Sequence, residues 1–295
     1  MKMMKTNYIM KSALLLACLV ALAARPAAAG LKITLVNLGG TPPDPTNLIG
    51  GGNLPELMEV AAKNWERVFN QEGKQWNLTV NYYWTNAPDL VTLYGQERMI
   101  AESGTAVSRI SSSRIVFNNQ PPLSDYPGAV PGYFVDPTPR KNSFYSVYES
   151  PLMEVEDEDF NPLGRLNVGR VFSGARGPAA GRIDLLTIAT HEIGHALGLD
   201  NEYTGHIQQF TNRLNLLITA PRPFAGLLVA LTSQNGDHIQ LGTLPPEIPL
   251  MISSPYPGIR QLITGMDALV LGQLSSFDRP DLGEPPGVPR VKEQP

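Results

Sequence analysis

The chain has 295 residues, of which 42% are hydrophobic and 17% charged, so it can fold around one large core or two small ones. Its formal net charge of −4, with no basic stripe along the sequence, argues against a nucleic acid as partner. Gly and Pro, at 27 residues each, predict a chain rich in loops.

The first 29 residues are predicted to be a secretory signal peptide that is cleaved before Gly30. Three lysines precede a short apolar run at 12–22, and the alanines at 27–29 provide a small-residue cleavage site. The apolar run is too short to cross a bilayer comfortably, which argues against a membrane anchor. A lipoprotein acylated at Cys18 is a further alternative, but Leu16 is bulky for that role and the apolar run continues past the cysteine.

Cleavage at this point would leave an acidic protein without cysteine. The leader holds four of the 23 basic residues and none of the 27 acidic residues, so the remaining chain has 19 basic residues and a net charge of −8. Cys18 is the only cysteine, so no disulfide can stabilise the mature protein. We expect a secreted protein, extracellular or periplasmic, with no stable membrane association.

The hydrophobic pattern predicts an α/β (α+β) fold for residues 30–278. Alternating apolar residues at 76–84 indicate the clearest strand, and Asn53 with Glu56 three residues later is typical of a capped helix start. The tail at 279–295 is rich in proline and polar residues, so we expect disorder there. In chain order, the expected elements are a strand at 31–36, a helix from Asn53 to Gly73, the strand at 76–84, strands at 114–117 and 166–172 with a long loop between them, a helix at 185–197 capped by Asp184, a mostly irregular segment, and a last helix at 264–274.

The strongest chemical signal lies in the helix predicted at 185–197. His191 and His195 are four residues apart and therefore share one helix face, where both imidazoles can bind a single zinc ion. Glu192 projects beside them without being a ligand, placed to take a proton from zinc-activated water and to deliver it to the leaving amine of a peptide. Gly194 costs up to about 1 kcal/mol relative to alanine in a helix, so we expect another segment to approach the backbone closely there.

Around this motif the sequence resembles the zinc signature of the matrixins, a family of the metzincin clan. The resemblance is tight over residues 191–200, HEIGHALGLD, in which Gly198 is expected to end the helix in a left-handed conformation. It is looser at Met251, which is similar to the methionine of the family's turn beneath the zinc ligands. Asp267 is similar to the family's aspartate that holds this turn.

The resemblance implies a zinc endopeptidase with a metzincin-like twisted mixed sheet. It implies two subdomains. Residues 30–199 would form a five-stranded upper subdomain that contains the active-site helix, and residues 200–278 would form a smaller irregular subdomain that ends in a helix. A protein or peptide substrate would lie between them. A non-catalytic zincin-like binding module is the alternative, although it would have no need of Glu192 as a general base. A zincin that uses a downstream carboxylate as ligand is a third reading, against which Gly198 and Met251 argue.

The third zinc ligand is the main departure from the family pattern. The family's third histidine would fall at Asn201, and a neutral amide oxygen is a weak zinc ligand. We favour His238 because it closely precedes Met251, as the family's third ligand closely precedes its methionine turn. The remaining alternatives are His206, Asp200, Asn201 and Glu202.

A second cofactor is considered at the acidic run of residues 154–159, EVEDED. Carboxylates gathered in a loop are typical ligands of Ca²⁺. A solvated acidic loop is the commoner outcome for such a run, so Ca²⁺ stands as an alternative beside the expected Zn²⁺.

Overall fold

The structure is a computed structural model that describes residues 30–70, 75–86, 95–101, 110–120, 129–200, 203, 215–232, 236–240, 246–277 and 279–284, with only the backbone given for 95–101. The predicted signal peptide lies outside the described residues, so it stays a prediction. None of the helices in the described ranges combines the length and the apolar character that crossing a bilayer requires.

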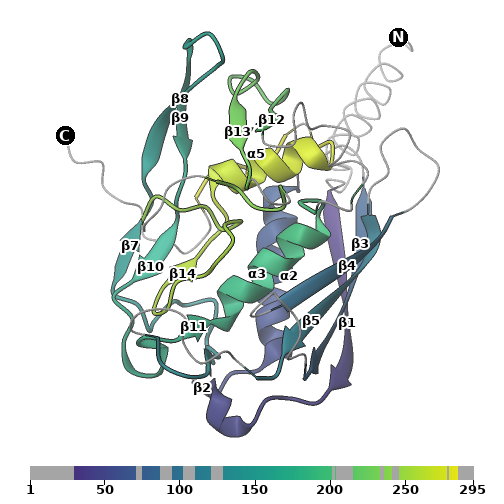
Figure 1. Cartoon of the computed structure of the whole chain (residues 1–295), viewed down its shortest axis with the longest axis vertical. Helices are drawn as coiled ribbons and strands as arrows, with labels where there is room; N and C mark the ends of the chain where they lie inside the picture. Colours follow the sequence, from purple (N-terminus) through teal and green to yellow (C-terminus); the bar gives the residue numbers. More distant parts are fainter. Residues whose placement is uncertain are drawn as a thin grey trace, which may run out of the picture.

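The described chain has a mixed α/β architecture with several small sheets around one larger sheet (Figure 1). In the larger sheet the first three strands run parallel and the last one runs antiparallel at the edge. Every second residue of its second strand, from Trp76 on, is buried, as the alternating sequence predicts. The strand order is β1 (Leu31–Gly40), β3 (Trp76–Thr85), β5 (Ile110–Asn118) and β4 (Gly95–Ala101).

The described part of this sheet has four strands, so the five strands implied by the family resemblance are not found. The segment after β1 contributes only β2 (Leu48–Ile49), which pairs with β6 (Tyr133–Phe134) in a separate small sheet with β11 (Ile183–Asp184). Prolines at 42, 43 and 45 precede β2, and proline lacks the N–H that a sheet ladder needs. Among the described strands, β1 is therefore an edge strand of the larger sheet.

Two helices lie against one face of the larger sheet (Figure 1). α2 (Leu54–Val68) packs on β1, and α3 (Leu185–Ala196) packs on β5 and β4. Asn53 caps α2 as predicted, because its side chain accepts a hydrogen bond from the backbone N–H of Glu56 at 2.9 Å. Buried Trp65 of α2 donates its indole N–H to the carbonyl of Thr190 at 2.8 Å, which joins the two helices.

The strand predicted at 166–172 is wrong, because the chain breaks there into β9 (Pro162–Asn167) and β10 (Val171–Ser173). The side-chain amide of Asn167 donates to the carbonyls of Gly169 and Pro151, at 2.9 and 3.1 Å, and these bonds hold a turn. The long loop predicted before it also contains short strands. β7 (Val147–Glu149) pairs with β10, which in turn pairs with β14 (Arg260–Gln261).

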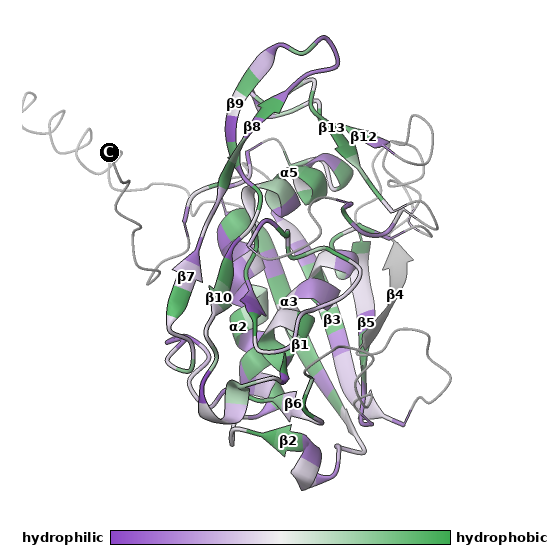
Figure 2. Ribbon diagram, turned by 60° about the vertical axis from the view of Figure 1, so that its left-hand side comes forward, coloured by the Kyte–Doolittle hydropathy of each residue, from purple (hydrophilic) through white to green (hydrophobic). Residues whose placement is uncertain are grey.

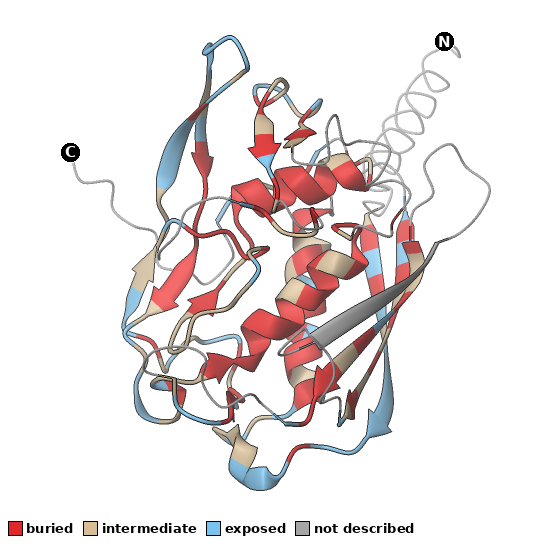
Figure 3. Ribbon diagram, in the orientation of Figure 1, coloured by how far each residue is buried: buried red, intermediate tan, exposed pale blue. Residues whose placement is uncertain are grey.

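β8 (Leu152–Glu156) and β9 form an antiparallel hairpin that projects from the body (Figures 1 and 2). Beyond α3 the described chain includes a second hairpin of β12 (Asn215–Leu217) and β13 (Leu228–Ala230). The last helix, α5 (Gly265–Leu274), begins where predicted, with Thr264 as its cap. Almost every residue of α5 is buried (Figure 3), so this helix belongs to the core.

One hydrophobic core extends across both predicted subdomains. Phe69 at the end of α2 stacks on Phe277 after α5, with ring centroids 4.2 Å apart. The boundary predicted at 200 therefore separates segments of the chain but does not separate two cores.

The disorder predicted from residue 279 onward is wrong for 279–284. The backbone N–H of Asp281 donates to the carbonyl of Val68 at 2.7 Å, and Arg67 pairs with the Asp281 carboxylate at 3.0 Å. These contacts satisfy a carbonyl at the end of α2 that would otherwise lack an intrahelical partner. Residues 285–295 lie outside the described part of the chain.

Candidate metal centre

Helix α3 carries His191 and His195, which are four residues apart and therefore share one face of the helix. Its first turn is held by Asp184, whose carboxylate accepts hydrogen bonds from the backbone N–H and the hydroxyl of Thr187, at 3.0 and 2.8 Å. Both histidines are half-buried, whereas most of the other α3 residues are buried in the core. The helix predicted from the sequence is confirmed, and it places the two rings on one face.

Backbone carbonyls fix the tautomer of both helix histidines. Nδ1 of His191 lies 3.0 Å from the carbonyl oxygen of Leu250, and Nδ1 of His195 lies 2.6 Å from that of Leu199. A carbonyl can only accept a hydrogen bond, so Nδ1 carries the hydrogen in each ring. The two Nε2 atoms, 2.9 Å apart, are then both acceptors that face each other.

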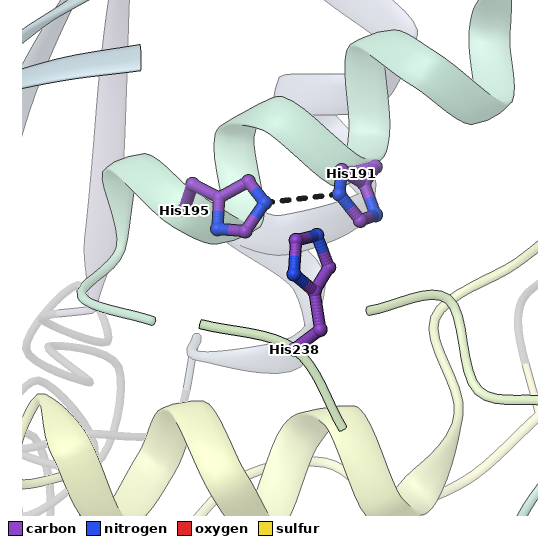
Figure 4. Close-up of side chains that lie close together, drawn as sticks. All are labelled: His191, His195 and His238. Atoms are coloured by element: carbon purple, nitrogen blue, oxygen red, sulfur yellow. Dashed lines mark hydrogen bonds between the residues drawn. The ribbon is translucent and has the colours of Figure 1, made fainter. Parts of the chain in front are cut away.

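His238 completes a group of three converging rings (Figure 4). Its ring centroid lies 5.3 Å from that of His191 and 4.9 Å from that of His195. Its Nδ1 donates to Oδ1 of Asp237 at 2.5 Å, so the lone pair of its Nε2 is available to a metal ion. One ligand atom from each of the three histidines lies within 4.8 Å of the others.

The donor set fits a small cation that prefers nitrogen ligands. Two imidazole nitrogens bound to one tetrahedral zinc, at about 2.0–2.1 Å each, lie roughly 3.3 Å apart. The 2.9 Å between the Nε2 atoms of His191 and His195 is close to this separation. Two facing lone pairs repel each other, and a cation between them removes that repulsion.

Of the other candidate ligands, Asp200 lies within the described part of the chain, and it does not join this group. Asp200 is half-buried, but its carboxylate is not part of the cluster of converging ligand atoms. Across the described ranges the three histidines are the only cluster of this kind. Asn201, Glu202 and His206 lie outside the described residues.

The acidic run at 154–159 forms part of the β8–β9 hairpin. The carboxylate of Asp157 accepts hydrogen bonds from the backbone N–H groups of Asp159 and Asn161, each at 2.9 Å. These bonds shape the hairpin turn, and no converging metal ligands are found among the described residues there.

No family model, curated protein or solved structure matches this chain. The site is therefore interpreted from its own chemistry.

Glu192 follows His191 on α3 and is buried, with 6% of its surface exposed. Burial, and to a smaller extent the negative charge of Asp237, raises the pKa of its carboxyl to about 8. A bound dication would lower this pKa again. A carboxyl whose pKa lies near neutrality can both accept and return a proton at physiological pH.

Met251 packs against Gly194, the residue of α3 that directly precedes His195. Its side chain is fully buried, and a Cβ placed on Gly194 would overlap its sulfur atom. The close approach expected at Gly194 is therefore confirmed. The Asp267 carboxylate accepts hydrogen bonds from the backbone N–H groups of Leu250 and Met251, both at 2.9 Å. The same turn thus supports the helix and presents the Leu250 carbonyl to His191.

Gly198 ends α3 as expected, with a φ of +120°. Its N–H donates to the carbonyl of His195 at 2.8 Å, and the chain then turns so that the Leu199 carbonyl reaches the His195 ring. A side chain at this φ would be strained, which explains the glycine.

Sequence reasoning missed two residues that support the site. Asp237 was passed over although it directly precedes His238 and could have been suspected as its hydrogen-bond partner. Arg260 binds the helix cap Asp184, and no local pattern connects two residues 76 positions apart.

A cavity of about 160 Å³ opens next to the segments that carry His238 and Met251. Its walls combine aliphatic side chains with hydroxyl and amide groups. They include Ile239, Gln240, Ile248, Ile252, Ser254 and Tyr256.

Proposed function

We propose that this protein is a secreted zinc-dependent endopeptidase in which His191, His195 and His238 bind the metal and Glu192 is the general base. The observation that carries the proposal is the convergence of three imidazoles at a helix that also carries a buried glutamate. Three protein ligands with one open position are typical of catalytic zinc, whereas structural zinc is closed by four.

A zinc ion held by these histidines would supply Lewis acidity, which polarises a scissile carbonyl and acidifies water. The carboxylate of Glu192 would take a proton from the attacking water and later give it to the nitrogen of the leaving amine. The Leu250 and Leu199 carbonyls keep hydrogen on Nδ1 of His191 and His195, so their Nε2 atoms stay available. The cavity beside Met251 supports a peptide substrate because it can accept one side chain of moderate size.

A matrixin-like member of the metzincin clan is the family that these residues support best. Gly198 ends the helix, Met251 packs against Gly194 between the two helix histidines, and Asp267 holds the turn. The proposed third ligand differs from the family pattern, because His238 comes from a segment 43 residues beyond His195. A non-catalytic binding module stays the alternative function.

The zinc content of the purified mature protein and its hydrolysis of casein test this proposal. We expect one zinc per chain, and activity that a chelator removes and added zinc restores. His238→Ala should lose zinc and activity, and His206→Ala serves as the control that keeps both. Loss of zinc in His206→Ala alone would reverse the ligand assignment. Zinc binding without hydrolysis of any peptide would favour the binding module.

A further inference from the structure

We propose that Asp237 is a positioning residue that orients His238 and supplies negative charge to the metal centre, an inference that rests on the proposed zinc function. It acts through the imidazole of His238. Its Oδ1 accepts the hydrogen of His238 Nδ1 at 2.5 Å.

The backbone around His238 is held in place next to the methionine turn. The carbonyl of His238 accepts a hydrogen bond from the N–H of Thr232 at 2.9 Å, and the N–H of Ile239 donates to the carbonyl of Met251 at 2.7 Å. Gly236, two residues before His238, has a φ of +72°, and its N–H donates to the carbonyl of Thr232 at 3.0 Å. These backbone hydrogen bonds fix the position of the His238 Cα, but they do not determine the orientation of its ring.

The ring itself is fixed differently from those of the other two histidines. His191 and His195 lie on a rigid helix, and each places Nδ1 against a neutral backbone carbonyl. His238 lies outside any helix or strand and places Nδ1 against a carboxylate. A charge-assisted hydrogen bond is shorter and roughly twice as strong as a neutral one. The carboxylate therefore supplies the orientation that the helix supplies elsewhere.

The charge of Asp237 also suits a site built from neutral ligands. Three imidazoles around a dication leave two positive charges that the ligands do not balance. Asp237 and Glu192 are close enough to influence each other electrostatically, and together they carry two negative charges when ionised. A carboxylate hydrogen-bonded to a ligating histidine also makes that histidine a stronger donor.

The affinity for zinc, measured by competition with a chromophoric chelator, tests this role. Asp237→Ala should weaken zinc binding by about 10–100-fold, the usual effect of removing such a partner. Asp237→Asn, which keeps the shape and loses the charge, should fall between this variant and the wild type. Exposed Asp159 on the β8–β9 hairpin offers the matched control, and Asp159→Asn should bind zinc as the wild type does.

A double variant distinguishes positioning from general support of the fold. In a His238→Ala background, where zinc binding is already weak, Asp237→Ala should cause a much smaller further loss of zinc affinity than in the wild type, because Asp237 acts mainly through the missing ring. The metal-free Asp237→Ala protein should melt at the wild-type temperature. A further loss in the double variant as large as the loss in the single variant, or a lower melting temperature, would overturn the positioning role.

The outcomes separate this inference from the proposed function. If the wild type binds zinc and both Asp237 variants bind it equally tightly, only the role of Asp237 is wrong. If the wild type itself binds no zinc, the proposed function and this inference fall together.

Discussion

Arg260 forms a bidentate ion pair with Asp184, the residue that caps the helix carrying His191 and His195. The guanidinium donates to the two carboxylate oxygens at 2.9 and 2.8 Å, and it also lies 2.8 Å from Asp136. All three side chains are buried. Arg260 follows Met251 by only nine residues. The segment 251–260 therefore contacts α3 at its start, through Arg260 and Asp184, and again at Gly194, through Met251.

Arg260→Met should destabilise the protein by about 3–5 kcal/mol, because it leaves Asp184 and Asp136 as buried carboxylates without their cation. Urea unfolding of the metal-free protein measures the change. Exposed Arg140, which pairs with Glu59 at 3.4 Å, is the matched control, and Arg140→Met should change stability by about 0.5 kcal/mol or less. Equal effects of the two substitutions would contradict a structural role for the buried pair.

Met251→Ala should lower stability by about 2–5 kcal/mol, because it removes a fully buried side chain and leaves a cavity beneath α3. It should also weaken zinc binding, since the His191 ring rests against the same turn. Met251→Leu keeps most of the volume and should cost less than about 1.5 kcal/mol. A Met251→Ala protein with unchanged stability and zinc affinity would show that this methionine does not support the site.

The metal-free protein should lose stability as the pH rises from 6.5 to 8. Glu192 has its folded-state pKa raised to about 8, so the folded state holds a proton that the unfolded state has already released. The loss is at most about 1.4 kcal/mol per pH unit. Burial, together with the nearby His195 and His238, lowers the pKa of His191, so this residue stays neutral in the folded state. The unfolded histidine loses its proton just above pH 6.5, which opposes the loss from Glu192 by less than about 0.5 kcal/mol.

Unfolding curves at pH 6.5 and 8.0 check this expectation. Glu192→Gln should abolish this loss of stability between the two pH values, and so should zinc, because a nearby dication lowers the carboxyl pKa. A slope that persists in Glu192→Gln would have to come from another group.

The parts of the site that sequence reasoning could predict are those that depend on neighbours along the chain. The cap Asp184, the four-residue spacing of the histidines and the positive φ of Gly198 all follow from local patterns within one helix. The contact at Gly194 could be expected as well, because a glycine inside a helix needs a reason.

The remaining features depend on contacts between distant residues. The break after Asn167 depends on the carbonyl of Pro151, and the ordered segment at 279–284 depends on Val68 and Arg67. The proximity of His238 to the helix histidines could be suspected only from its distance to Met251. The role of Asp237 as the hydrogen-bond partner of His238 follows only from the orientation of the imidazole ring, which the sequence does not give.

The mature protein should begin near Gly30 and be exported. The reason is the order of lysines, a short apolar run and small residues in the first 29 positions. N-terminal sequencing of the exported protein measures the start directly. A start at Met1 or at an acylated Cys18 would show that this leader is not cleaved as expected.

The most direct measurement of the central claim compares Glu192→Gln with the wild type for zinc content and peptide hydrolysis in one preparation. Glu192 is a buried residue of α3 that does not join the cluster of ligand atoms, so the variant should still bind one zinc per chain. Its hydrolysis should fall by about 10²–10⁴-fold, the usual contribution of a general acid–base residue. A variant that keeps both zinc and near-full activity would contradict the proposed mechanism.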